Sequence, residues 1–316
     1  MKNVKSNVDA TVVSNWKKSR HVDQTLKDQI DKMNAIELRK AFSKKQLAFG
    51  TAGIRAKMGP GTQYLNGFVY KQIMIGYCKY VLKRKAHPTI MIAHDNRKYS
   101  DVFAKICADV AIKMGVNVYL PEDNKLLPTP ILSYAIRKYG LDGGVNITAS
   151  HNPKGDNGFK AYNHKGGQVM PTDADIIVKS LPPSSEILSL DKYLVAKHKG
   201  EIKYLDYYPL VDDFFEVIIK KVNIDKTFLL PNAPIKKMPI VFTGFHGTTT
   251  ELVPRMLSKL GFKKVYLYPL HADINGEFKN CPISNPEDVN AFNDVIRYAT
   301  KKKATLIIGC DPDGDR

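Results

Sequence analysis

Three aspartates near the end of the sequence have the spacing of a metal site. Asp311, Asp313 and Asp315 stand at alternate positions directly after an apolar run at 304–309 that predicts a strand. In an extended chain this spacing puts the three side chains on one side, and in a turn they converge. Converging carboxylates repel one another unless a hard cation lies between them. We expect Mg²⁺ rather than Ca²⁺, because Arg316 stands where an EF-hand loop has glycine and no glutamate follows.

A serine in a cation-rich segment is the second group that could do chemistry. Ser150 lies in the segment 148–154, at the end of a predicted strand, where open α/β sheets place their ligands. It is flanked by four cationic residues, and such charge suits a phosphate bound to a hydroxyl or arriving at it. They are His151, Lys154, Lys160 and Lys165. A Ser–His hydrolase is the competing interpretation. Against it, adjacent residues of an extended chain point to opposite sides, and no G-x-S-x-G elbow surrounds the serine.

Together the two segments predict a phosphoryl transfer. Ser150 would carry a phosphoryl group, Mg²⁺ on the aspartates would neutralise its oxygens, and the group would pass in line to a substrate hydroxyl. Lys160 and His151 are the nearest candidates for the base that takes the acceptor's proton. A lysine serves as a base only if its pKa is depressed, for which neighbouring cations and burial are the usual causes.

Two arginines and one further histidine are weaker candidates. Arg55 lies in the glycine-rich segment 49–61, where backbone N–H groups could approach an anion and the guanidinium could clamp a phosphate. This segment is neither a G-x-G-x-x-G fingerprint nor a P-loop, so turn-forming glycine is the structural alternative. Arg97 follows a predicted strand and could support the Ser150 segment or form a surface ion pair. We expect His246 to be structural.

The elements that must position these groups alternate between strands and helices, which predicts an α/β fold of layered domains with mixed sheets. The predicted strands are 89–93, 116–120, 144–147, 239–242, 265–268 and 304–309. The predicted helices are 68–84, 100–115, 129–139, 209–221, 248–260 and 287–302, with Ser100 capping one and a Thr248–Glu251 capping box opening another. We expect a helical extension at 1–45, one α/β domain at 46–205 and a second at 206–316.

Composition excludes several classes of protein. The 316 residues are 43% hydrophobic and 25% charged, which rules out collagen-like, disordered and disulfide-scaffold chains. The net charge of +17 comes from 39 Lys and only nine Arg, and there is no aromatic-interleaved basic patch, so we expect no nucleic-acid partner. No apolar run approaches the ~18 residues of a membrane span. Four cysteines without a CxxC pair and a polar N-terminus favour the cytoplasm.

Three segments resemble the α-D-phosphohexomutase family, which comprises phosphoglucomutases, phosphomannomutases and relatives. They are FGTAGIRAKMGPG at 49–61, TASHNPKGDNGFKAY at 148–162 and DPDGDR at 311–316, and the N-terminal extension with Trp16 is similar to the longer phosphoglucomutase and phosphopentomutase branch. The resemblance implies that Ser150 is the phosphoserine, that its phosphate shares Mg²⁺ with the aspartates, and that Lys160 is the general base. Phosphate or substrate contacts are expected for Arg55, Arg97, Asn152, Lys154 and Arg316.

The family reaction converts a hexose 1-phosphate to the 6-phosphate through a sugar 1,6-bisphosphate that turns over in the site. Family members have four domains, and the resemblance covers the first two, so the sugar- and distal-phosphate-recognition loops are missing from this sequence. We therefore expect little mutase activity from the chain alone. A fragment, a truncated gene, a recoded stop codon or one half of a split protein would each explain this. In the last case the missing domains are a partner on a separate chain.

Other interpretations share the same motifs. A phosphopentomutase or a sugar-bisphosphate synthase of this family would have every segment quoted above and would differ in the sugar-recognition loop. A non-catalytic phosphosugar-binding fragment is the alternative from another class. Phosphate on Ser150 would favour an enzyme, whereas absence of both phosphate and Mg²⁺ binding would favour the fragment.

Overall fold

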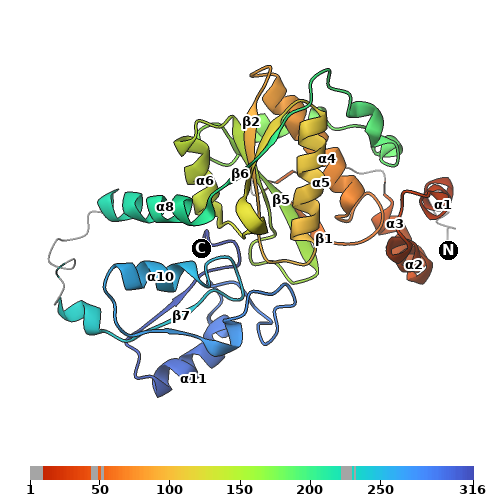
Figure 1. Cartoon of the computed structure of the whole chain (residues 1–316). Coiled ribbons are helices and arrows are strands. Elements are labelled where there is room, and N and C mark those ends of the chain that lie inside the picture. Colours follow the sequence, from red (N-terminus) through yellow and green to blue (C-terminus); the bar gives the residue numbers. More distant parts are fainter. Residues whose placement is uncertain (1–9, 44–48, 51–52, 222–229, 231–232) are drawn as a thin grey trace.

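The computed structural model describes residues 10–43, 49–50, 53–221, 230 and 233–316. These residues form two lobes, each a β-sheet with helices packed on it, which lie one above the other in Figure 1. The first lobe contains the described residues up to 205 and the second lobe those from 233. Helix α8 (Tyr207–Lys221) follows the first lobe, and the end of the chain lies where the two lobes meet (Figure 1).

The sheet of the first lobe is mixed, as expected. Its strands in spatial order are β1 (Ile54–Lys57), β5 (Asp156–Asn163), β4 (Gly143–Ile147), β2 (Thr89–His94), β3 (Asn117–Pro121) and β6 (Ile202–Leu205). β5 runs antiparallel to both β1 and β4, whereas β4, β2, β3 and β6 are parallel. The connection from β4 to β5 is the segment that contains Ser150, so this serine lies at the carboxyl end of a buried strand.

Helices cover both faces of this sheet because its central strands are apolar on both sides. Ile90 and Ile92 of β2 pack with α4 (Gly67–Leu82) and α5 (Ser100–Lys113), and α7 (Pro171–Lys179) lies on α4. The alternate residues Met91 and Ala93 pack with α6 (Thr129–Lys138) and α8. The alternation follows the two-residue period of a strand.

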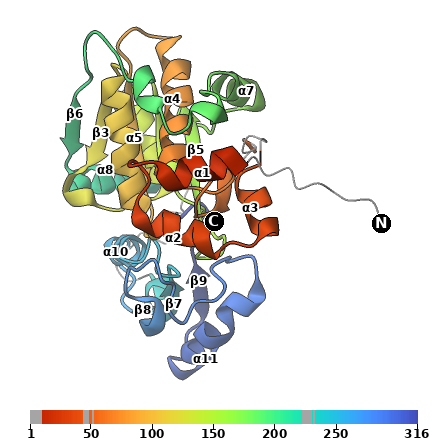
Figure 2. The same ribbon diagram turned by 90° about the vertical axis from the view of Figure 1, so that its right-hand side faces the viewer.

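The N-terminal extension forms three short helices, α1 (Ala10–Lys18), α2 (Gln24–Lys32) and α3 (Ala35–Ala41). Trp16, the single tryptophan of the sequence, is 1% exposed and meets the rings of Phe42 and Phe68 edge-on, with centroid distances of 5.5 and 5.2 Å. Phe68 belongs to α4, so the aromatic cluster fastens the extension to the first lobe. Figure 2 shows the three helices side by side against that lobe.

The second lobe has a smaller sheet of the order β8-β7-β9, formed by β7 (Ile240–Thr243), β8 (Val265–Leu267) and β9 (Leu306–Gly309), all parallel. Its helices are α10 (Leu252–Lys259) and α11 (Asn293–Lys301). The described residues also contain short 3₁₀ helices: η1 (Glu122–Asn124), η2 (Ser184–Glu186), η3 (Leu190–Tyr193), η4 (Pro234–Lys237), η5 (Pro269–His271) and η6 (Val289–Phe292).

The two lobes repeat one topology. The order β4-β2-β3 in the first lobe matches β9-β7-β8 in the second, and all these strands are parallel within their sheets. Ser150 follows β4 and the three aspartates follow β9, so the two candidate segments occupy equivalent positions. Because ligand sites of parallel sheets form at carboxyl ends of strands, the two ends can build one site if the lobes face each other.

Two predicted helix caps are wrong. Helix α10 begins at Leu252, and Thr248 donates its hydroxyl to the carbonyl of Pro312 at 3.0 Å instead of capping the helix. At α5 the capping position is held by Tyr99 with φ 65°, and Ser100 donates its hydroxyl to Asp95 at 2.7 Å. In both cases the hydroxyl bonds to residues outside the helix, and its oxygen accepts no N–H of the first helical turn.

Three strands were not predicted, and one predicted helix is divided. β1 lies inside the glycine-rich segment, β5 inside the polar stretch after Ser150, and β6 inside the mixed residues after 190. The predicted helix at 287–302 is η6 followed by α11. Charged and glycine-containing strands such as β5 have no long apolar run in the sequence. Whether such a segment forms a strand depends on the neighbouring strands with which it pairs.

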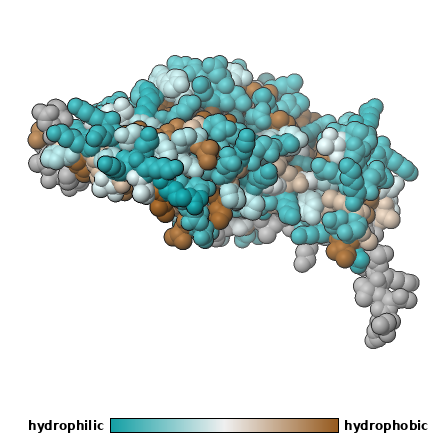
Figure 3. Space-filling view, turned by 90° about the horizontal axis from the view of Figure 1, so that it is seen from below, coloured by the Kyte–Doolittle hydropathy of each residue, from teal (hydrophilic) through white to brown (hydrophobic). Residues whose placement is uncertain are grey.

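None of the helices in the described part of the chain is long and apolar enough to cross a membrane. Figure 3 shows one face of the molecule, which is largely hydrophilic with small separate apolar groups. Such scattered groups are normal on a protein surface.

We predict that Gly247→Ala destabilises the second lobe. A Cβ at Gly247 would lie 2.3 Å from Cα and 2.5 Å from the carbonyl oxygen of Pro312, so the loop after β9 would have to move. Forced overpacking of this kind costs about 1–3 kcal/mol. Urea unfolding followed by circular dichroism measures the loss. Gly155→Ala is the matched control, because a Cβ there meets nothing within 4 Å. Equal unfolding midpoints for the two variants would contradict the prediction.

Candidate active site

The serine loop (residues 148–156) presents Ser150 to the second lobe. Ser150 is fully buried and has φ 54°, a left-handed conformation that is uncommon for residues other than glycine. Its N–H donates to the Thr148 hydroxyl at 2.8 Å, and its own hydroxyl donates to a carboxylate oxygen of Asp311 at 2.5 Å. The candidate nucleophile and a candidate metal ligand, one from each lobe, are therefore in direct contact.

His151 lies closer to the serine than an extended chain allows. Its Nδ1 is 3.3 Å from the Ser150 hydroxyl and 3.8 Å from Asp311. The argument that the two adjacent side chains point apart is wrong here, because the left-handed backbone at Ser150 turns the chain. Burial lowers the pKa of His151, and the guanidinium groups of Arg316 and Arg55 lower it further. The ring is therefore neutral at pH 7 and can exchange a proton with a neighbouring oxygen.

Arg97 holds the backbone of the serine loop. It is 2% exposed, and its two terminal nitrogens donate to four carbonyl oxygens of the loop at 2.5–3.0 Å: those of Ser150, Asn152, Pro153 and Asp156. Its Nε lies 3.3 Å from the buried carboxylate of Asp95. A planar guanidinium is suited to this because its donors have a rigid, spread geometry.

This geometry corrects one expectation for Arg97. Its N–H donors face the loop carbonyls and Asp95, so the predicted phosphate contact does not fit the structure. The other interpretation, support of the serine loop, does. The face of the guanidinium also lies 5.1 Å from the ring centroid of Phe278 in the second lobe, so the same residue contacts both lobes.

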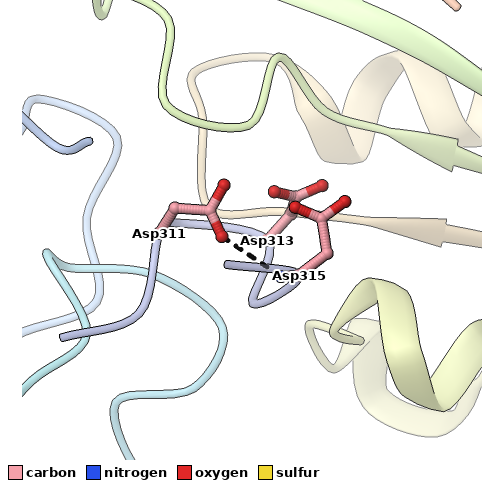
Figure 4. A group of neighbouring side chains, drawn as sticks. All are labelled: Asp311, Asp313 and Asp315. Atoms are coloured by element: carbon pink, nitrogen blue, oxygen red, sulfur yellow. Dashed lines mark hydrogen bonds between the residues drawn. The ribbon is translucent and has the colours of Figure 1, made fainter. Parts of the chain in front are cut away.

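The aspartate loop (residues 311–316) gathers its three carboxylates. One ligand atom from each of Asp311, Asp313 and Asp315 lies within 4.8 Å of the others, and Figure 4 shows the three groups on one side of the loop. Asp311 and Asp313 are buried. The second oxygen of Asp311 accepts the N–H groups of Asp315 and Arg316, both at 3.1 Å, which closes the loop around it. Gly314, at φ 73°, makes this turn possible.

Charge and hydrogen bonding at these carboxylates fit a divalent cation. Burial raises the pKa of Asp311 to about 7, and the nearby charge of Asp313 adds to this. Oδ1 of Asp313 is buried without a hydrogen-bond partner. An unpaired buried carboxylate oxygen is costly, and a hard cation would both pair it and relieve the repulsion. The residues that would hold Mg²⁺ are Asp311, Asp313 and Asp315.

Lys160 lies between two of these carboxylates. On β5 it is 1% exposed, and its Nζ is 2.5 Å from Asp313 and 2.6 Å from Asp315. Burial works to lower the pKa of Lys160, but Asp313, Tyr162 and Asp315 together raise it well above the ordinary value. The depressed pKa that a basic lysine needs is therefore absent from this arrangement. A cation bound to Asp313 and Asp315 would neutralise the charges that raise the pKa of Lys160.

The other predicted contact residues lie around the same edge. Arg55 of β1 donates to the side-chain oxygen of Asn152 at 3.3 Å, and its Nε is buried without a partner. Arg316 pairs with Glu287 at 3.0 Å. Lys154 points away to Glu277, 3.6 Å distant, with 63% of its side chain exposed. Lys154 therefore lines a cavity of about 600 Å³ between the serine loop and residues 277–284 rather than the carboxylate group.

His246 is structural, as expected. It is fully buried, and its two ring nitrogens lie 2.7 and 2.6 Å from the carbonyl oxygens of Asp273 and Lys279. These two contacts hold the segment 273–279, and residues 277–279 of it line the cavity beside Lys154.

Sequence reasoning missed two residues of this site. Thr129 of the first lobe donates to Asp313, and Glu287 fixes Arg316. Thr129 opens a helix between two prolines, which marks a helix start but indicates no carboxylate partner. Glu287 lies in Asn285-Pro286-Glu287, a turn signal that indicates no ion pair.

We predict that Arg97→Met loosens the serine loop. The change leaves Asp95 as an unpaired buried charge and removes the donors of four carbonyls, so we expect a loss of about 3–5 kcal/mol in unfolding free energy. Urea unfolding measures this, and amide hydrogen exchange over 150–156 should become faster. Lys154→Met is the control, because an exposed ion pair contributes about 0–1 kcal/mol. Unchanged exchange in the loop would show that Arg97 does not hold it.

Known proteins match this chain over both of its lobes. Residues 46–186 match the model for phosphoglucomutase/phosphomannomutase α/β/α domain I, and residues 212–316 match that for α/β/α domain II. A phosphomannomutase of Mycoplasmoides pirum is 39% identical over 310 residues, or 96% of this chain and 55% of that protein. A Staphylococcus aureus phosphoglucomutase is 34% identical over 296 residues, or 93% and 51%. The chain therefore spans about half the length of the curated relatives it matches.

Solved structures agree in fold. A phosphoglucomutase/phosphomannomutase family protein from Burkholderia thailandensis superposes with a TM-score of 0.67 at 23% identity, over 86% of this chain and 54% of that one. Parafusin, a phosphoglucomutase from Paramecium, gives 0.60 at 20% identity, over 87% and 53%. With the two domain matches covering most of its residues, this chain belongs to the phosphoglucomutase/phosphomannomutase family, the α-D-phosphohexomutases.

Proposed function

We propose that this chain is the phosphoryl-transfer half of a phosphosugar mutase. The observation that carries the proposal is the contact between Ser150 and Asp311, in which a buried hydroxyl from one lobe meets the carboxylate group of the other at 2.5 Å. A phosphoryl group on that hydroxyl would lie beside the three aspartates. Mg²⁺ held there would neutralise the charge on the phosphoryl oxygens.

The residues of the chain support the remaining parts of an in-line transfer. The bond between phosphorus and the Ser150 oxygen breaks as a bond to the substrate hydroxyl oxygen forms, and the proton of that hydroxyl passes to a base. His151, neutral and 3.3 Å from the serine oxygen, is one group that can take or return a proton. Lys160 can do so once the carboxylates around it are neutralised. Arg55 supplies a buried N–H donor that no described protein group accepts.

The substrate is proposed from the relatives. Those described above are named phosphomannomutase and phosphoglucomutase, which favours a hexose phosphate exchanged between its 1- and 6-positions through a 1,6-bisphosphate. Phosphopentomutase and sugar-bisphosphate synthase remain alternatives, because they use the same transfer groups. Since the chain matches about half of its relatives, we propose that recognition of the sugar and of the distal phosphate comes from outside these 316 residues.

We also propose the setting of the reaction. The four cysteines are free, which supports a reducing compartment such as the cytoplasm. The proposed partners are a phosphosugar and, if recognition lies on a second polypeptide, the domains that carry it. Nucleic acid is not among them, because the lysine-rich charge comes with no groove-reading motif.

We predict that a sugar bisphosphate phosphorylates Ser150. Incubation with glucose 1,6-bisphosphate and Mg²⁺ should add one phosphoryl group, because the bisphosphate is the donor that recharges the serine in such a cycle. Intact-mass spectrometry and peptide mapping detect the group. Ser150→Ala is the control and should gain none. A chain with no phosphate on Ser150 before or after incubation would favour the non-catalytic alternative.

We predict slow mutase turnover for the chain alone. Distal-phosphate binding normally supplies orientation for the transfer, and its loss lowers the rate of the chemical step as well as affinity. Conversion of glucose 1-phosphate to the 6-phosphate, measured with bisphosphate and Mg²⁺ present, should fall far below that of a full-length relative. Turnover similar to the full-length enzyme would show that these two lobes suffice.

A further inference from the structure

Thr129 connects the first lobe to the aspartate loop through two hydrogen bonds. It opens α6, and its N–H donates to the carbonyl oxygen of Asp313 at 2.8 Å. Its hydroxyl donates to Oδ2 of the same aspartate at 2.9 Å. Backbone and side chain of Asp313 are thus both held by one residue that sequence analysis assigned only to a helix.

Asn146 sets the direction of that hydroxyl. It lies on β4, is fully buried, and its Nδ2 donates to the Thr129 oxygen at 2.8 Å. The hydrogen bond between Thr129 and Asp313 can have only one direction, because an ionised carboxylate only accepts hydrogen bonds. Thr129 must give its single proton to Asp313, so its oxygen is left to accept from the amide of Asn146.

These bonds leave Asp313 with one free oxygen. Oδ2 accepts from Thr129 at 2.9 Å and from Lys160 at 2.5 Å, whereas Oδ1 is buried and has no partner. Asn146 and Lys160 are directly paired across β4 and β5, so the donors come from adjoining positions of one sheet. The first lobe therefore provides a preformed socket for this carboxylate.

We propose that Thr129 and Asn146 are positioning residues that orient Asp313 toward a divalent cation. The proposal rests on the metal site of the proposed function and adds to it that the first lobe, which supplies no aspartate, sets the direction of one ligand. Without the donor, only Lys160 holds Oδ2, so the Asp313 carboxylate can rotate and the unpartnered Oδ1 is no longer kept in one position. Two hydrogen bonds, from Asn146 to Thr129 and from Thr129 to Asp313, then end on a carboxylate that would hold the cation.

The alternative is that Thr129 only fastens the two lobes together. In that case loss of its hydroxyl would lower stability without changing metal affinity. Titration with Mn²⁺, followed by electron paramagnetic resonance of the free ion, separates the two roles without any assay of activity. Thermal unfolding without metal gives the stability of each variant.

Thr129→Val keeps the shape of the side chain and its backbone bond but removes the donor. We expect Mn²⁺ affinity to fall about 10- to 100-fold, the usual effect of losing a group that orients a metal ligand. Thr129→Ser restores the hydroxyl and should bind Mn²⁺ nearly as the unchanged protein does. Thr62→Val is the matched control, because the hydroxyl of Thr62 donates to a backbone carbonyl elsewhere, at 3.1 Å, and its loss should leave affinity unchanged.

Asn146→Asp tests the direction of the chain while Thr129 stays in place. The ionised carboxylate that this variant introduces only accepts hydrogen bonds. The Thr129 hydroxyl would therefore turn toward it and leave Asp313, and affinity should fall, but less than in Thr129→Val, because the added negative charge attracts the cation. Folded variants of both kinds with unchanged Mn²⁺ affinity would overturn the inference while leaving the metal site standing.

Two further outcomes complete the test. If Thr129→Val does not fold, Asn146→Asp and Thr129→Ser decide the matter through the same Mn²⁺ titration. An unchanged protein that binds no Mn²⁺ would instead refute the metal site, and the inference with it.

Discussion

A buried ion pair between the two lobes is the constraint on which the candidate site depends. Lys160 and Asp313 are 1% and 0% exposed, with 2.5 Å between the ammonium and the carboxylate. Two charges removed from water are tolerated only when they are closely paired and their other polar atoms are bonded. Asp315 gives Lys160 a second carboxylate partner and Thr129 gives Oδ2 of Asp313 a second donor, while Oδ1 of Asp313 is left for the proposed cation. Because one partner comes from each lobe, the same contacts set the position of the lobes and the geometry of the aspartates.

The serine loop is held by separate means. Arg97 binds four of its carbonyls, so the backbone around Ser150 has little freedom even though its conformation is uncommon. Strained backbone persists only where surrounding contacts overdetermine it, and such positions are concentrated at functional sites. The consequence is a hydroxyl aimed at Asp311, with His151 turned to the same side.

The proposed chemistry draws on groups from both lobes. The groups proposed to transfer or neutralise a phosphoryl group lie on β1 and β5 and in the loops that follow β4 and β9. Family membership rests on matches to both lobes, whereas the relatives are about twice as long. We therefore propose that the choice of sugar, and the binding of its distal phosphate, depend on groups outside these two lobes.

The sequence by itself determined the α/β class, most central strands and helices, and the two candidate segments, because apolar periodicity and residue spacing are local properties. It also placed Ser150 and the three aspartates at the ends of strands. Only the tertiary structure decided that His151 faces the serine, that Lys160 is held as a cation, that Arg97 binds carbonyls and that Thr129 reaches Asp313. Each of these depends on a partner distant in the chain or on a left-handed backbone. No local pattern encodes a long-range partner, since a hydroxyl or guanidinium takes whichever acceptor the packed lobes bring to it.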